Sequence, residues 1–196
     1  MLKALLMSEE TFKDHPNVIG VLTLKYTALM MSGEYDKANK FIVDQYTKYQ
    51  SESRLLDVGC AKGFMLHDIA KAIPEITLKG IDVSEYAIAN AIEGMKPNIQ
   101  VADAKELPFE DNSFDVVISI NTIHNLEKNE LAKALQEIER VSRGKSFITV
   151  DAYNSKEEKE RMYLWNLTAK TIMSVDEWIS FFNEVGYTGD YYWFIP

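Results

Sequence analysis

The chain has a single cysteine, Cys60, among its 196 residues. One thiol cannot form an internal disulfide or a cysteine-rich metal site. Histidine is also scarce: His15, His67 and His124 are scattered along the sequence and show no metal-ligand spacing. We therefore expect neither a structural disulfide nor a bound metal.

Long hydrophobic runs and basic residues are also lacking. No apolar run approaches the length of a membrane span, and the one within residues 1–7 is too short for a secretory signal. Lysine and arginine total 21 against 30 aspartate and glutamate, a formal net charge of −9. Because phosphate groups are neutralised by basic surfaces, this charge argues against unaided binding to nucleic acid or an anionic membrane. We expect a cytoplasmic protein that uses neither as a partner.

Short apolar runs alternate with helical patterns from residue 54 onward. The apolar runs predict strands, and the segments between them have the 3.6-residue periodicity of helices that pack on a core. Such alternation predicts an α/β fold: a doubly wound, mostly parallel sheet with helices on both faces. A capping box at Ser174 and Glu177 predicts a last helix, and the aromatic residues of 187–195 predict a late antiparallel strand or hairpin.

The first 53 residues differ from this alternation. Helical spacing of apolar residues over 17–33 and 35–49 predicts helices without an intervening strand. We therefore divide the chain into an N-terminal helical cover, residues 1–53, and an α/β domain, residues 54–196. The cover is expected to act as a lid.

The turn from Asp57 to Gly63 lies between a predicted strand and a predicted helix. Its small residues let a ligand approach the backbone, and Asp57 stands at the end of a strand where open α/β sheets bind ligands. Phe64 excludes a phosphate-binding P-loop, which needs lysine and then serine or threonine after its last glycine. A dinucleotide fingerprint fits weakly, because Ala61 and Phe64 occupy two of its glycine positions.

This turn resembles the first motif of the class I S-adenosylmethionine-dependent methyltransferases, an acid followed by alternating glycines. Ala61 departs from that motif, since glycine is commonest there. The resemblance covers residues 54 to about 151 and implies a Rossmann-like sheet of the seven-stranded type. It also implies that Asp82, at the end of the next strand, holds the ribose hydroxyls and that Asp103 lies beside the adenine. The cofactor contacts expected on this basis are Asp57, Gly59, Cys60, Ala61, Gly63, Asp82, Val83, Asp103, Ala104 and Asn121.

The segment 121–126, after the fourth predicted strand, lines the methyl-transfer site in the resembled family. His124 is our candidate for a general base near pH 7; the alternative is a structural histidine hydrogen-bonded to its loop. Asp151, after the fifth strand, is the second candidate for the catalytic base.

The resemblance implies methyl transfer from S-adenosylmethionine to a small-molecule acceptor with an oxygen, nitrogen or carbon nucleophile, leaving S-adenosylhomocysteine. The segment 121–124 lacks the Asn/Asp-Pro-Pro-aromatic run of amino-methylating nucleic-acid enzymes, and Cys60 lies in the wrong loop for a cytosine-C5 nucleophile. Two alternatives remain: a non-catalytic S-adenosylmethionine-binding regulator or subunit, and a nicotinamide-dinucleotide oxidoreductase. We expect a monomer or a homodimer.

Overall fold

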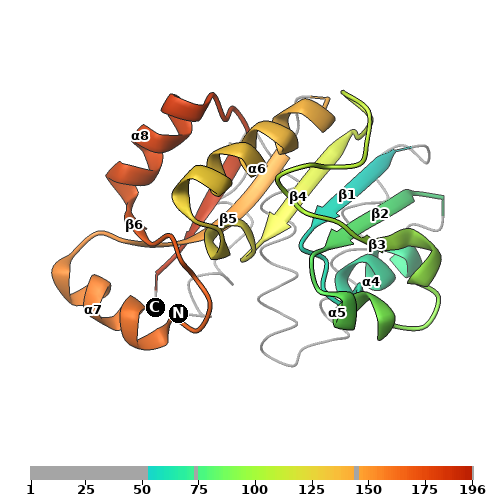
Figure 1. The fold of residues 1–196 in the computed structure, drawn as a ribbon, viewed down its shortest axis with the longest axis horizontal. Coiled ribbons are helices and arrows are strands. Elements are labelled where there is room, and N and C mark those ends of the chain that lie inside the picture. Colours follow the sequence, from blue (N-terminus) through green and yellow to red (C-terminus); the bar gives the residue numbers. More distant parts are fainter. Residues whose placement is uncertain (1–52, 73–74, 144–145, 196) are drawn as a thin grey trace.

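The computed structural model describes residues 53–72, 75–143 and 146–195 (Figure 1). Within these ranges seven strands form one sheet in the order β3-β2-β1-β4-β5-β6, with β7 paired to β5. The strands are β1 (Arg54–Val58), β2 (Thr77–Asp82), β3 (Ile99–Val101), β4 (Val116–Ile120), β5 (Ser146–Tyr153), β6 (Met173–Ser174) and β7 (Asp190–Phe194). The predicted N-terminal cover falls almost wholly on residues 1–52, which lie outside the described residues.

The helices connect successive strands. They are α4 (Phe64–Ala72), α5 (Glu85–Ala89), α6 (Lys128–Val141), α7 (Lys156–Trp165) and α8 (Val175–Val185), with short 3₁₀ turns η2 (Lys96–Asn98) and η3 (Ile123–Asn125). The predicted capping box of α8 is present: Ser174 accepts from the Glu177 backbone, and the Glu177 side chain accepts from the Ser174 backbone. None of the helices within the described ranges is long and apolar enough to cross a membrane.

Two hydrophobic clusters cover the two faces of the sheet. Leu56 and Val117 pack with α6 and α8 on one face, whereas Leu55 and Ile118 pack with α4 on the other. Neighbouring residues of one strand thus enter opposite clusters, as the two-residue period of a strand requires. In Figure 1, α6 and α8 lie in front of the sheet. The doubly wound α/β prediction is confirmed.

The prediction of a late antiparallel strand is wrong. The β7 strand pairs parallel to β5, with Phe147 opposite Asp190 and Asp151 opposite Phe194. The reason is the connection: α8 lies between β6 and β7, and a helical crossover brings the chain back to start the next strand in the same direction.

Some element limits also differ from their predicted positions. The sequence predicts that the helix capped by Ser84 continues to Ile92, but it ends at Ala89. The sequence also predicts a strand or an extended segment over 168–173, but the strand β6 contains only Met173 and Ser174. None of these shifts moves a strand end that carries a predicted site residue.

The strand order reverses between β1 and β4, because β2 and β3 lie to one side of β1 and β5 lies to the other side of β4. Such a switch point leaves a crevice at the carboxyl ends of the two central strands, where open α/β sheets bind ligands. The turns after β1, β2, β3 and β4 therefore all meet at one edge.

Candidate functional site

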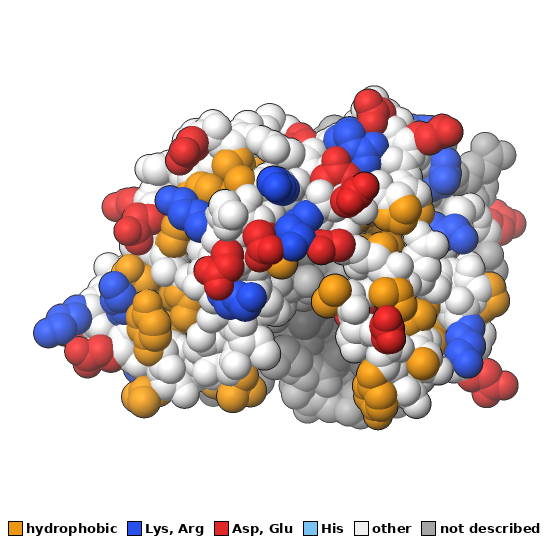
Figure 2. Space-filling model, viewed as in Figure 1, with side chains coloured by type: hydrophobic (Ala, Val, Ile, Leu, Met, Phe, Trp, Pro, Cys, Tyr) orange, Lys and Arg blue, Asp and Glu red, His pale blue; other side chains and the backbone are white. Residues whose placement is uncertain are grey.

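A cavity of about 620 Å³ lies at this edge of the sheet. Seven of the ten expected cofactor contacts line it: Gly59, Ala61, Asp82, Val83, Asp103, Ala104 and Asn121. They come from the turns that follow four different strands. Figure 2 shows the molecule hollowed on the side toward which the central strands run in Figure 1, beneath a band of acidic and basic side chains.

The turn after β1 requires glycine at position 59 for two reasons. Gly59 has φ +90°, which side chains disfavour. A Cβ atom there would also lie 2.2 Å from the Thr122 side chain, in the turn after β4. The backbone N–H groups of Gly59 and Cys60 both donate to the carbonyl oxygen of Ile81, at 2.8 and 2.9 Å. The turn is therefore held against β2 and against the turn after β4.

Ala61 also adopts the left-handed conformation, with φ +47°. An L-residue other than glycine is disfavoured there. This explains physically why glycine is commonest at this position of the resembled motif. The alanine methyl group is tolerated at some cost in strain.

Asp82 connects the glycine turn (residues 57–63, after β1) to the end of β2. One carboxylate oxygen accepts from Ala61 N and the other from Ser84 N, both at 2.8 Å. The side chain lines the cavity, and each oxygen retains a further lone pair for a ligand. A carboxylate fixed in this way suits a pair of vicinal hydroxyl groups such as a ribose diol.

The carboxylate of Asp103 is paired with Lys105, a contact that the sequence does not indicate. One oxygen accepts from Lys105 N at 2.9 Å, and the other lies 3.3 Å from Lys105 Nζ. Lys105 Nζ also lies 2.6 Å from a carboxylate oxygen of Glu130 at the start of α6. The turn after β3 is thereby tied to α6 across the cavity wall.

Asp57, Cys60 and Gly63 do not line the cavity. Asp57 is buried beneath the glycine turn, and no described residue donates a hydrogen bond to its carboxyl group. Burial, followed by the negative charge of Asp82, raises the pKa of Asp57 to about 7. The Cys60 side chain points into the core against Gly80, and burial raises the pKa of its thiol. Gly63 has φ +79° and precedes α4.

His124 and Asp151 lie together behind the cavity rather than on its wall. His124 Nδ1 accepts from Asp151 N at 3.3 Å, and Nε2 lies 3.8 Å from an Asp151 carboxylate oxygen. The His124 carbonyl accepts from the backbone N–H groups of Lys170 and Thr171. Burial lowers the pKa of His124 to about 4 and raises that of Asp151 to about 6. His124 is thus neutral near pH 7 and is engaged in structural contacts.

Several lining residues are not among the individual site residues expected from the sequence. Thr122, Asn125 and Leu126 belong to the segment 121–126, which is expected as a whole to line the methyl-transfer site. Glu130 and Lys170 belong to α6 and to the segment before β6. No local pattern marks these two, because only packing brings them to the cavity.

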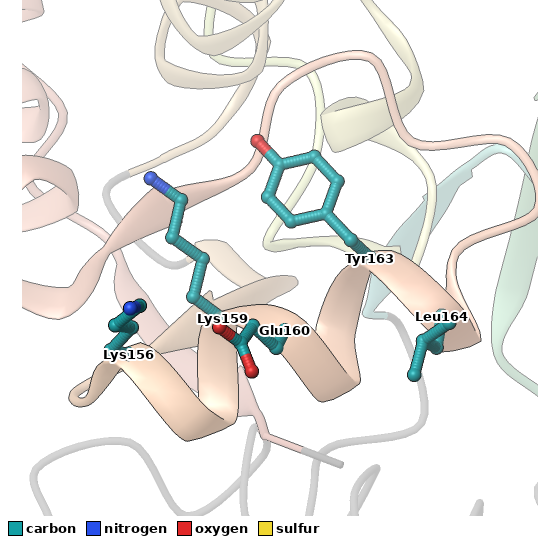
Figure 3. Close-up of a pocket in the computed structure, with 5 residues that line it drawn as sticks. All are labelled: Lys156, Lys159, Glu160, Tyr163 and Leu164. Carbon is teal, nitrogen blue, oxygen red and sulfur yellow. The ribbon is translucent and has the colours of Figure 1, made fainter.

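A second hollow lies along α7 and is lined by Lys156, Lys159, Glu160, Tyr163 and Leu164 (Figure 3). All five residues belong to one helix, and Lys159 and Tyr163 project from the same side of it. It contains no expected site residue. Within the described ranges, no group of three or more histidine, cysteine, aspartate or glutamate residues could hold a metal ion. The cavity at the strand ends is therefore the candidate site.

The fold and this cavity agree with the resemblance seen in the sequence. A parallel sheet with a switch point, a glycine turn after β1 and a fixed carboxylate after β2 are features expected of a class I S-adenosylmethionine-dependent methyltransferase. The residues present fit that cofactor, since the cavity combines a glycine-lined approach, a carboxylate placed for a diol and further acids.

Comparison with known proteins agrees with this classification. Residues 56–150 match the family described as a methyltransferase domain. Over these residues the chain is a class I S-adenosylmethionine-dependent methyltransferase domain, and S-adenosylmethionine is the cofactor of that class.

Three proteins similar to this chain differ from one another in name and in the share of their length that the chain covers. Mitochondrial arginine-hydroxylase NDUFAF5 of Mus musculus is 36% identical over 90 residues, which are 44% of this chain and 24% of the mouse protein. The 27-O-demethylrifamycin SV methyltransferase of Amycolatopsis mediterranei is 27% identical over 68% of this chain and 53% of the enzyme. The chain thus spans about a quarter and about half of these relatives. The YcgJ protein of Bacillus subtilis has the same fold, with a TM-score of 0.59 at 19% identity over 76% of this chain and 68% of that one.

Proposed function

We propose that this protein transfers a methyl group from S-adenosylmethionine to a small-molecule acceptor through an oxygen, nitrogen or carbon nucleophile. One observation carries the proposal: a single cavity joins the turns expected to hold the cofactor to a further wall formed by Asn125, Leu126 and Lys170. A second reactant bound along that wall would lie next to the cofactor. The net charge of −9 supports a small acceptor over a nucleic acid.

When bound, the cofactor supplies an electrophilic methyl group on a sulfonium, so the protein mainly orients the reactants and excludes water. Asp82 would accept hydrogen bonds from the ribose hydroxyls while it holds the glycine turn. Asp103 and Ala104 would lie along the adenine. Asp57 would place a negative charge beneath the glycine turn, where it favours a bound cation.

The wall on the acceptor side has mixed chemistry. Leu126 offers an apolar surface, Asn125 an amide, and Lys105, Glu130 and Lys170 offer charges. Lys105 and Glu130 are already paired at 2.6 Å, which leaves the pair close to neutral. We infer an acceptor with both apolar and hydrogen-bonding groups.

We assign His124 a positioning role rather than that of the base. The variant His124→Ala is expected to lower the melting temperature and turnover together, because it releases Asp151 N and leaves a buried space. Any inflection between pH 6 and pH 7 in the wild-type turnover should come from Asp151 or Asp57 and persist in a stable His124→Gln variant, since the pKa of His124 is lowered to about 4. An inflection near 6.5 that disappears in a stable His124→Gln variant would identify His124 as the base.

Asp57→Asn should affect stability and binding in opposite directions. A carboxyl whose pKa rises from 3.8 to about 7 on folding stabilises the protein only while it is protonated. This stability is present below pH 3.8 and is lost as the pH rises through 7, a loss of up to about 4 kcal/mol. The neutral amide avoids the loss, so the cofactor-free variant should melt higher than the wild type at pH 8.

The same variant should bind S-adenosylmethionine more weakly at pH 8, because a negative charge close to a cation is gone. In the wild type, affinity should rise between pH 6 and pH 8 as Asp57 ionises. Calorimetric melting and titration at pH 6 and pH 8 measure both effects. A variant that is no more stable at pH 8 than the wild type would contradict the buried charge.

A methylation assay tests the proposed activity. The purified chain is incubated with methyl-labelled S-adenosylmethionine and a library of small metabolites, and transfer of label is measured. We expect transfer to one acceptor or one chemical class, and its loss in Asp82→Ala. Cofactor binding without transfer to any acceptor would favour the non-catalytic regulator, and binding of a nicotinamide dinucleotide alone would favour the oxidoreductase.

A second acceptor class rests on one relative. The mouse protein that is 36% identical over 90 residues is named an arginine hydroxylase. We therefore propose free arginine and arginine-containing peptides as additional members of the library. Methyl transfer to a peptide but to no metabolite would show that the acceptor is a protein rather than a small molecule.

A further inference from the structure

Asn121, the first residue after β4, has an unusual conformation. Its φ angle is +51°, in the left-handed region, although it is not a glycine. Such residues concentrate at functional sites, where the surrounding structure holds them in place. Asn121 lines the cavity, so its strain lies at the site itself.

Thr149 of β5 provides the restraint. Asn121 N donates to Thr149 Oγ1 at 2.8 Å, and Thr149 Oγ1 donates to Asn121 Oδ1 at 2.7 Å. The threonine is buried, with 2% of its surface exposed. One hydroxyl group therefore fixes both the backbone and the side chain of Asn121.

This pair of hydrogen bonds also orients the Asn121 amide. The Thr149 hydroxyl hydrogen needs an acceptor in its buried position, and the described part of the chain offers Asn121 Oδ1. Nδ2 then keeps both of its hydrogens, and no described residue accepts either of them. An amide so placed can donate to an acceptor atom of a ligand, such as a carboxylate oxygen.

The restraint extends to the glycine turn. Thr122 follows Asn121 and occupies the space next to Gly59, where a Cβ atom would come within 2.2 Å. The position of Asn121 therefore sets how closely the turn after β4 approaches the turn after β1. Both turns line the cavity.

We propose that Thr149 is a positioning residue of the cofactor site, acting through the left-handed Asn121 to present an amide donor to a carboxylate-bearing ligand. The proposal rests on the assignment of the cavity to S-adenosylmethionine, but not on transfer of the methyl group. Thr149 itself does not line the cavity. Its effect on binding must therefore pass through Asn121.

The test is calorimetric titration with S-adenosylhomocysteine, together with thermal melting. Thr149→Val keeps the shape of the side chain but removes the hydroxyl group, and should weaken affinity about tenfold, while Thr149→Ser should remain within about twofold of the wild type. Asn121→Asp keeps the oxygen that Thr149 contacts but replaces the free donor with a charge, so it should fold normally and also bind about tenfold more weakly.

The coupling between the two residues is tested with Asn121→Gly. Glycine adopts a positive φ without help, so in this background Thr149→Val should change affinity less than about twofold. The matched control is Ser146→Ala, which removes another buried hydroxyl group at the amino end of β5, where it contacts the Tyr187 hydroxyl at 3.2 Å. This control should lose stability but keep its affinity.

Wild-type affinity in Thr149→Val, or a tenfold loss that persists in the Asn121→Gly background, would overturn the proposal. A wild-type protein that does not bind S-adenosylhomocysteine would overturn it together with the cofactor assignment. If the wild type binds and the Thr149 effects appear but no methyl transfer is found, the proposal stands and the proposed activity fails.

Discussion

Replacing Asp82 with alanine is expected to weaken S-adenosylmethionine binding at least tenfold in a protein that still folds. The carboxylate has two tasks. It accepts from Ala61 N and Ser84 N at 2.8 Å, which fixes the glycine turn, and it faces the cavity, where a ribose diol would be held. Hydrogen bonds to a charged group contribute roughly 1.5–3 kcal/mol each, so losing the ligand contacts alone accounts for the expected tenfold effect.

Asp115→Ala is the matched control for this prediction. Asp115 also accepts from a backbone N–H group, that of Arg54 at 2.8 Å, and from Arg143 at 2.8 Å. It lies at the amino end of β4, the opposite edge of the sheet from the cavity. The control should lose stability without losing affinity. Unchanged calorimetric affinity in a folded Asp82→Ala variant would refute the ribose assignment.

Replacing Gly59 with alanine is expected to be the most damaging single methyl addition in the turn after β1. The positive φ angle of +90° costs roughly 1–2 kcal/mol for a residue with a side chain. The new methyl group would also lie 2.2 Å from the Thr122 side chain, and overpacking of this kind costs roughly 1–3 kcal/mol. The two turns must move apart, so cofactor affinity should fall more than about tenfold along with stability.

Gly94→Ala separates these two costs. Gly94 has φ +84°, nearly the same as Gly59, but a Cβ atom there would meet nothing within 4 Å. This control should lose only the conformational part, roughly 1–2 kcal/mol, and keep its affinity. Equal losses of stability in the two variants, measured by chemical denaturation, would show that Thr122 moves aside without cost.

The sequence predicts the fold well where hydrophobic pattern and turn residues agree. The runs around Leu55, Ile81 and Val117 are buried on both faces, as nearly continuous apolar strands of a parallel sheet must be. Gly186 ends the last helix in the left-handed conformation, as its position predicts. The direction of β7 is not predicted from its aromatic residues, because pairing direction depends on the path of the connection through α8 and not on the strand itself.

The candidate site, like the fold, is predicted from the sequence only in part. Asp82 and the glycines can be recognised because they follow strands at the spacing of a known motif. The role of Ala61 as a strained position, the displacement of Cys60 into the core and the burial of His124 behind the cavity depend on how the turns pack. His124 illustrates the point: the sequence permits a base or a structural residue, and its contacts with Asp151 and the Lys170 backbone favour the second.

The sequence by itself determined the class of the protein and its cofactor, because local order of strand, turn and helix is encoded by residues that are neighbours in the chain. Only the tertiary structure decided which side chains share the cavity. Glu130, Lys170 and the Thr149 hydroxyl that holds Asn121 lie 9 to 49 positions from Asn121 in the sequence. Contacts over such separations arise from packing of the sheet and its helices, and no local pattern in the sequence predicts them.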